Sequence, residues 1–278
     1  MVLGVGLHEI LWLAIATLVG GAVSGLLAGM LGVGGGSLLV PVLYEAFRLA
    51  GVPEDVRMQL CLGTSIAIVV PTTIRSFLTH RAKGFVIPGV IRQWIVPGVG
   101  GVACSAAIAA FAPAAVLTIA FIVIASLIAV KLLFVRDRWN LGSELPGPLA
   151  MALYGFGIGF GGSLMGVSGG GLSTIVLTLY RQPIHNAVAT SSGIAVPICI
   201  AGAVGFMVAG LPHEAQLPPL SLGFVSLVGV AVVAPVASFM APHGAHLAHR
   251  LSRRTLEIAF GCFLQLVALR FLVGLFYG

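Results

Sequence analysis

The sequence predicts an all-α integral membrane protein that crosses the bilayer many times and consists of two related halves. Three observations predict this fold class: a composition dominated by apolar residues, a series of apolar segments of membrane-spanning length, and a glycine-rich motif that occurs twice. Of the 278 residues, 59% are hydrophobic and only 8% are charged, whereas about 25% of the residues of a soluble domain are charged. The mean hydropathy is +1.12. No stretch is left over for a soluble domain.

The apolar segments have the length of about 20 residues that a helix needs to cross a bilayer. They lie at 10–31, 58–79, 86–111, 113–134, 148–167, 187–210, 219–241 and 255–277. Two shorter segments, at 36–49 and 170–181, follow the glycine motifs. We expect about 8–10 membrane helices in a single membrane domain, 1–278. The first segment lacks the positively charged start of a cleavable signal, so we expect it to be retained.

The internal repeat organises the chain. The first glycine motif, "LGVGGGSLLVP" at 31–41, is matched by the second glycine motif, "MGVSGGGLSTI" at 165–175, at an offset of 135. Thr64-Ser65 and Pro71 are matched by Thr190-Ser191 and Pro197 at an offset of 126. The nine-residue difference falls in the connectors between these elements. The sequence therefore predicts repeat 1 at about 8–135 and repeat 2 at about 148–277.

The distribution of basic residues predicts how the halves are oriented. Loops 80–83, 131–138 and 246–254 are rich in Lys and Arg, so all three are expected on the cytoplasmic side. This requires the short segment 170–181 to pair with 148–167 as a helical hairpin. Each half then has five helices, four spans plus a glycine-broken hairpin partner. Loops 111–115 and 211–219 carry neither Lys nor Arg, so equivalent loops exchange their charge character. This exchange predicts inverted-topology repeats with both termini on the outer side.

The three consecutive glycines in each motif point to a ligand site. Non-helical backbone within a membrane is tolerated only inside protein or along a water-filled cavity. The start of the following helix carries unpaired N–H groups and partial positive charge, which favour an anion. Close helix packing is the alternative explanation for these glycines. The candidate binding residues are Gly34, Gly35, Gly36, Ser37, Thr64, Ser65, Ser168, Gly169, Gly170, Gly171, Ser173, Thr190, Ser191 and Ser192.

The charged residues favour an anion over a cation. All eight acidic residues lie near segment ends or in loops, except Glu45 in the short segment after the first glycine motif. Cation pumps usually keep carboxylates in the membrane interior. Arg75, about five residues inside the first basic loop, is the candidate cation for the ligand, and a snorkelling role at the interface is its alternative. His80 is a candidate hydrogen-bonding or titrating group.

The motifs resemble those of the sulfite exporter TauE/SafE family over nearly the whole chain. The resemblance rests on "GMLGVGGGSLLVP" with "LGTSIAIVVP", then "GVSGGGLSTIVL" with "AVATSSGIAVP", "SLGFV" and "GAHLAHRLSRRTLE". It implies a secondary transporter of sulfur-containing anions such as sulfite, sulfoacetate or other organosulfonates. The family's glycine motifs fall on Gly32 to Ser37 and on Val167 to Gly171. Ser168 and Val176 depart from the usual pattern, so we expect the two half-sites to contribute unequally.

Two other functions remain open from the residues alone. Gly166 to Gly170 fits the GxSxG spacing, in which Ser168 would be the nucleophile of an intramembrane hydrolase. A passive anion channel is the third hypothesis, because channels and transporters share sites lined by backbone and helix dipoles.

The expected partners follow from the hypothesis that the protein is a transporter. They are a small sulfur-containing anion and the lipid bilayer of a bacterial-type inner membrane, with no nucleic acid and no cofactor. No metal site is expected, because the four cysteines lie in apolar segments without metal-ligand spacing. Proton or sodium coupling and homo-oligomerisation are left open.

Overall fold

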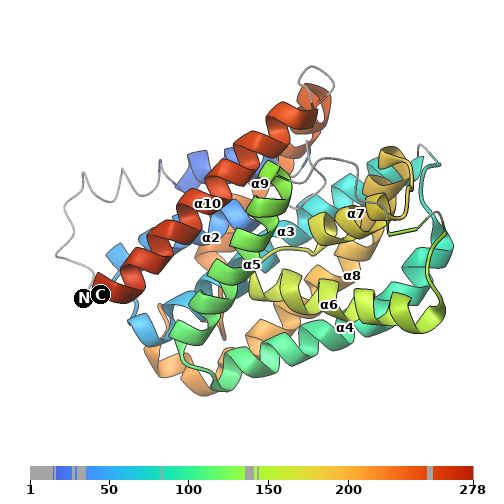
Figure 1. Ribbon diagram of the computed structural model, residues 1–278. Coiled ribbons are helices and arrows are strands. Elements are labelled where there is room, and N and C mark those ends of the chain that lie inside the picture. The colour runs from blue at the N-terminus through green and yellow to red at the C-terminus, as the bar shows by residue number, and fades with distance from the viewer. Residues whose placement is uncertain are drawn as a thin grey trace.

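A computed structural model describes residues 15, 17–26, 29, 36–82, 84–134, 141–142, 144–248 and 253–277. The chain forms a bundle of helices (Figure 1). The helix Thr17–Leu26 precedes the labelled elements. These are α2 (Gly36–Leu49), α3 (Glu54–Ala82), α4 (Pro88–Phe111), α5 (Ala114–Phe134), α6 (Pro148–Leu164), α7 (Gly170–Leu179), α8 (Ile184–Gly210), the 3-10 helix η1 (Leu211–Gln216), the strands β1 (Ser221–Leu222) and β2 (Val225–Ser226), α9 (Leu227–Ala248) and α10 (Arg253–Tyr277).

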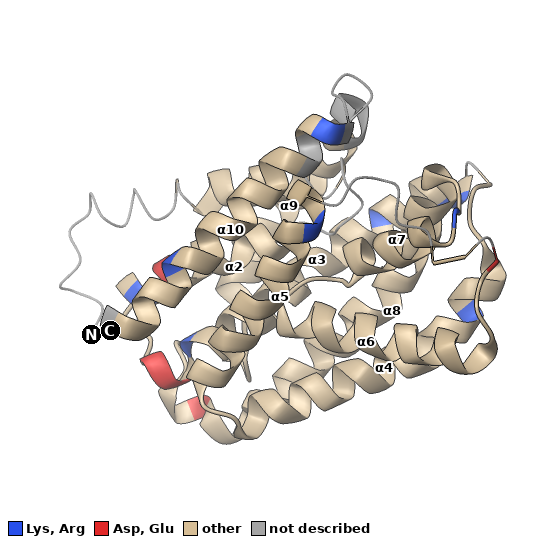
Figure 2. Cartoon of the chain, viewed as in Figure 1, with Lys and Arg blue, Asp and Glu red and all other residues tan. Residues whose placement is uncertain are grey.

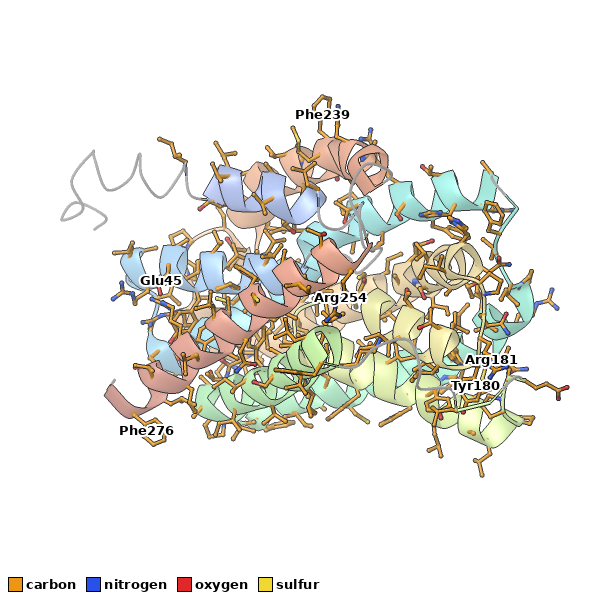
Figure 3. The ribbon with its side chains drawn as sticks, turned by 45° about the horizontal axis from the view of Figure 1, so that its top comes forward. Glu45, Tyr180, Arg181, Phe239, Arg254 and Phe276 are labelled. Atoms are coloured by element: carbon orange, nitrogen blue, oxygen red, sulfur yellow. The ribbon has the colours of Figure 1, made fainter. Side chains whose placement is uncertain are left out.

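The expected all-α, multi-pass membrane fold is confirmed. Six of the described helices are long and apolar enough to cross a membrane: Glu54–Ala82, Pro88–Phe111, Ala114–Phe134, Ile184–Gln216, Leu227–Gly244 and Ile258–Phe276. Thr17–Leu26, Pro148–Leu164 and Gly170–Leu179 are shorter apolar helices. Large apolar side chains point away from the bundle, as Figure 3 shows for Phe239 and Phe276. These two side chains are 61% and 78% exposed. A lipid environment accommodates such a surface. The chain is therefore a multi-pass integral membrane protein.

The helices α3 and α8 form the centre of the bundle and are the most buried of the six long helices. They run antiparallel. Gly193 of α8 packs on Phe77 of α3, and Gly202 packs on Ile66. Helices that are apolar on all sides are typically buried, which agrees with the long apolar segments expected here. The two matched prolines, Pro71 and Pro197, lie inside these two helices.

The helices α5 and α10 form a second antiparallel pair. Phe121 packs edge-to-face on Phe271, and Gly261 lies against Leu133. At the end of the pair, the Arg254 guanidinium donates to the carbonyls of Leu132 (2.8 Å) and Leu133 (2.6 Å) in the last turn of α5. A cation in this position satisfies carbonyls that have no intrahelical donor. Two of the three basic segments thus meet at one end of the bundle. Most charged residues lie toward the helix ends (Figure 2).

Two further helix pairs pack through glycines four residues apart. The helix α6 runs along α4, as Figure 1 shows, and Thr17–Leu26 packs against α9 in the same manner. The contacts are Gly155 with Trp94, Gly159 with Gly98, Gly21 with Val233, and Gly25 with Ala237. A β-carbon at Gly159, Gly21 or Gly25 would collide with the facing helix, and one at Gly155 would make tight contacts of 3.1 Å, so small residues permit the close approach.

The connector before α9 differs from the sequence expectation. An apolar segment was expected from 219, but α9 begins at Leu227, after η1 and the β1–β2 hairpin. Ser221 pairs with Ser226 and Leu222 with Val225 around the turn Gly223-Phe224. Phe224 is fully buried, and its N–H donates to the Phe206 carbonyl of α8 (3.1 Å). The apolar residues before Leu227 therefore belong to a hairpin tucked against α8.

Candidate functional site

The second glycine motif forms a tight turn between α6 and α7. Gly166 and Gly169 have φ values of +67° and +68°, in the left-handed region that favours glycine. Val167 N–H donates to Gly162 O (2.9 Å), and Gly166 N–H donates to Ser163 O (3.0 Å). A β-carbon at Gly169 would lie 2.8 Å from Ile158 Cγ2. Both the conformation and the lack of space therefore require glycine here.

The two glycine motifs meet in the buried core. Ser65 of α3 stands between them, with its Oγ 2.7 Å from Gly166 O and 3.0 Å from Gly36 O. Its single proton is thus shared between two carbonyls that belong to different halves of the chain. A β-carbon at Gly36 would collide with Gly166 O. Of the first glycine triplet the structure describes only Gly36, because Gly34 and Gly35 lie outside the described residues.

The start of α2 carries a buried hydroxyl without a described partner. Ser37 is 1% exposed, and its Oγ has no hydrogen-bond partner among the described residues. It occupies the first turn of a 14-residue helix, where backbone N–H groups have no intrahelical acceptor. A buried hydroxyl and the positive end of a helix dipole thus coincide at one point.

The start of α7 is lined by hydroxyls. Gly170 N–H donates to Ser168 Oγ (3.4 Å), and Ser173 Oγ donates to Gly169 O (3.0 Å). Thr174 Oγ1 lies 3.0 Å from Gly170 O and 3.0 Å from Ser191 Oγ of α8. Gly171 lies in the first turn of α7, where helix geometry provides no acceptor for its N–H group. Ser191 is therefore joined to the second glycine motif, as Ser65 is joined to both motifs.

Thr64 and Thr190 hold backbone amides of the opposite half. Thr64 Oγ1 accepts from Ser226 N–H (2.9 Å), just before α9, and Thr190 Oγ1 accepts from Ile87 N–H (3.0 Å), just before α4. The two threonines match in the sequence at an offset of 126, and the two amides at an offset of 139. Both threonines are fully buried.

The motif "SLGFV" was noted in the sequence, but its match in the first half, and the role of both elements in supplying these amides, were missed. Gly84-Phe85-Val86-Ile87 and Gly223-Phe224-Val225-Ser226 match at an offset of 139. Both glycines have positive φ, +74° and +52°. The repeated "GFV" could have revealed them. The connector of the second half is longer, and Phe224 is fully buried while Phe85 is 40% exposed.

The two glycines with positive φ, Gly84 and Gly223, provide a prediction. We expect Gly223→Ala to lower the melting temperature in detergent far more than Gly84→Ala does. Each alanine would sit in the left-handed region, which costs about 1–2 kcal/mol. At Gly223 the methyl group would also collide with the Met207 carbonyl, whereas no atom lies within 4 Å of a β-carbon at Gly84. Equal melting temperatures for the two variants would contradict the packed position of the hairpin.

Two predicted site residues do not join these contacts. Arg75 is exposed and donates to the Ser238 carbonyl of α9 (3.2 Å). Ser192 is buried and donates to Ala189 O, within its own helix (2.7 Å). Cys199 of α8 is also fully buried.

The buried polar groups are uncharged. No charged side chain is buried within the described residues, and the buried hydroxyl and amide side chains are serines, threonines, Tyr180 and Gln59. Glu45 is partly exposed and pairs with Arg48 (2.9 Å) and with Arg270 of α10. Figure 3 shows Glu45 and Arg181 at opposite ends of the molecule. Arg270 lies inside the last apolar segment, and sequence reasoning did not single it out. The core therefore offers hydroxyls and amides for a ligand rather than charges.

Comparison with known proteins gives consistent results. The sequence matches the family described as "Sulfite exporter TauE/SafE" over residues 17–271. It is 28% identical over 249 residues to a probable membrane transporter protein of Haemophilus influenzae, covering 90% of this chain and 94% of that protein. It is 25% identical over 264 residues to a probable membrane transporter protein of Methanocaldococcus jannaschii, covering 94% of this chain and 96% of that protein. No solved structure gives a significant match.

Proposed function

From the premise that the chain belongs to the sulfite exporter TauE/SafE family of membrane transporters, we propose that it carries a small sulfur-containing anion of the sulfite or organosulfonate class. The anion binds where the two glycine motifs meet, between the first turns of α2 and α7. Family and relatives indicate a transporter rather than an enzyme, so we assign Ser168 to binding and not to nucleophilic catalysis.

The junction of Gly36, Ser65 and Gly166 carries this proposal. The Ser65 hydroxyl engages the carbonyl oxygens of both motifs, so the acceptors at the junction are already bonded. Helix N-terminal amides and the Ser37 hydroxyl remain as donors. A pyramidal or tetrahedral oxyanion presents several acceptor oxygens and no donor when ionised, which suits such a donor set.

The absence of buried charge among the described residues supports reversible binding of an anion. A buried cation would hold an anion strongly, and a buried carboxylate would repel it. Neutral donors aligned by helix dipoles attract an anion more weakly. Because transport requires release of the anion as well as its capture, binding of moderate strength favours transport.

We propose that the two halves are inverted repeats, 8–135 and 148–277, that rock against each other to give alternating access. Two observations support this. The equivalent helices α3 and α8 run antiparallel, as do α5 and α10. The contacts of α4 with α6 recur in those of α9 with Thr17–Leu26. An inverted repeat requires this antiparallel, reciprocal arrangement.

Binding of sulfite, sulfoacetate, taurine and acetate to the purified protein, measured by calorimetry, tests the function. We expect saturable binding of a sulfur anion, and Ser37→Ala should weaken it about ten-fold or more, because a hydrogen bond to a charged group contributes about 1.5–3 kcal/mol. Ser105→Ala is the matched control. It also removes a buried hydroxyl without a described partner, but from α4. If neither Ser37→Ala nor Ser105→Ala weakens binding, the anion does not bind at the start of α2.

A further inference from the structure

Trp94 places an unused hydrogen-bond donor in the protein interior. The side chain lies on α4 and is fully buried, and its Nε1 has no hydrogen-bond partner among the described residues. The indole N–H can only donate. Buried donors in native proteins are nearly always paired, so an unpaired one calls for an explanation such as a ligand or an ordered water molecule.

The surroundings of Trp94 place it beside the second half-site, which consists of the second glycine motif together with Thr190 and Ser191 of α8. Trp94 belongs to a buried cluster that joins α4, α6, α7 and α8. Its members are Val90, Trp94, Val102, Met151, Ile158, Leu177, Ala187, Ile194 and Ile198. Ile158 is also the residue that a β-carbon at Gly169 would strike. The second glycine motif therefore packs directly on this cluster.

The same helix faces carry the hydroxyls of the half-site. On α8, Thr190 and Ser191 lie between the cluster members Ala187 and Ile194, at the three- and four-residue spacing that defines one face of a helix. On α7, Thr174 precedes the cluster member Leu177 by three residues, and its hydroxyl lies 3.0 Å from Ser191 Oγ. The apolar cluster around Trp94 and the hydroxyls of Thr174, Thr190 and Ser191 thus form adjoining layers.

Helix packing alone does not require an indole at this position. A β-carbon built at Gly155 of α6 would lie 3.1 Å from the Trp94 backbone, and in the matching contact of the other half Gly21 lies against Val233. A valine thus occupies the corresponding position of α9. The donor is present in only one of the two halves, which matches the expectation that the half-sites contribute unequally.

We propose that Trp94 Nε1–H donates a hydrogen bond to an oxygen of the transported sulfur oxyanion at the second half-site. This inference rests on the proposed function and adds a residue to its site. It makes Trp94 a specificity-determining residue. The N–H holds a ligand oxygen that carries negative charge, and the carbon portion of an organosulfonate such as sulfoacetate faces the cluster.

The intrinsic fluorescence of Trp94 provides a direct test. The chain has three tryptophans, and the other two, Trp12 and Trp139, lie outside the described residues. In the full-length variant W12F/W139F, Trp94 is the sole indole. We expect sulfite or sulfoacetate to change its emission saturably, with the midpoint that calorimetry gives for the same variant. Chloride at equal ionic strength is the control.

The second arm removes only the donor. Trp94→Phe keeps an aromatic ring but lacks the N–H, and we expect it to weaken anion binding about ten-fold. Ser105→Ala on the same helix should bind as wild type does. If Trp94→Phe does not fold, the fluorescence arm still decides.

The outcomes separate the two proposals. If the anion binds by calorimetry but leaves the Trp94 emission unchanged, the indole does not contact it and water is the partner of the N–H. The inference on Trp94 is then wrong while the proposed function stands. If no sulfur anion binds to the wild-type protein, the proposed function fails first and the inference fails with it.

Discussion

Replacing Gly36 with alanine is expected to reduce transport more than ten-fold. The added methyl group would collide with the Gly166 carbonyl and would lie 3.0 Å from Ser65 Oγ and 3.1 Å from Val167 Cγ1. Overpacking of this kind typically costs about 1–3 kcal/mol, and here it also separates the two motifs that form the proposed site. Anion uptake into proteoliposomes measures the loss, and calorimetry on the same variant measures binding.

Gly157→Ala is the matched control for this experiment. Gly157 lies in α6, and no atom lies within 4 Å of a β-carbon built there. Alanine is favoured over glycine in a helix by about 0.5–1 kcal/mol, so this variant should be at least as stable as wild type. Unimpaired transport by Gly36→Ala, with Gly157→Ala equally active, would show that the junction is not part of the pathway.

The second large effect is expected for Thr64→Val. Valine has nearly the shape of threonine but cannot accept the hydrogen bond from Ser226 N–H, and Ser226 is only 4% exposed. A buried donor left without an acceptor costs about 1–3 kcal/mol. For a chain of this size we expect the melting temperature to fall by roughly 3–10 °C, measured by thermal unfolding in detergent.

Thr190→Val is the comparison that makes this prediction specific. It removes the equivalent bond to Ile87 N–H, but Ile87 is only partly buried, so water can replace the lost acceptor. We therefore expect a smaller fall in melting temperature. A larger effect at Thr190 than at Thr64 would refute the assignment of the tightly packed connector to the second half.

Helix positions were largely predictable because apolar run length determines them in a membrane protein. The segments expected at 36–49, 86–111 and 113–134 are close to α2, α4 and α5 as observed. The start of α9 was not predictable in this way. The apolar residues of 217–226 resemble a helix by hydropathy, yet Pro218, Pro219 and Gly223 break it into a hairpin. The inverted orientation of the halves stays a prediction.

For the candidate site, the sequence predicted the residue types but not their partners. Duplication of the glycine motifs pointed to Gly36 and to the turn before α7, and these lie together at Ser65. The sequence offered no means of seeing that Thr64 bonds to an amide 162 residues away. Such a bond depends on how the halves cross, and periodicity within a helix carries no information about that. Trp94 was missed for the same reason.

The reciprocal packing of the halves has a consequence for biogenesis. Gly21 and Gly25 pack against Val233 and Ala237, so the helix Thr17–Leu26 meets its partner only after more than 200 further residues have been inserted. Until α9 has been inserted, the glycine-containing face of this helix contacts lipid or helices other than its final partner. The most extensive helix contacts, those of α4 with α6, α5 with α10 and α3 with α8, join the two halves, so a ribosome that stalls after residue 135 leaves an incomplete fold. We expect the separately expressed halves to be degraded, and co-expression in one membrane to restore both.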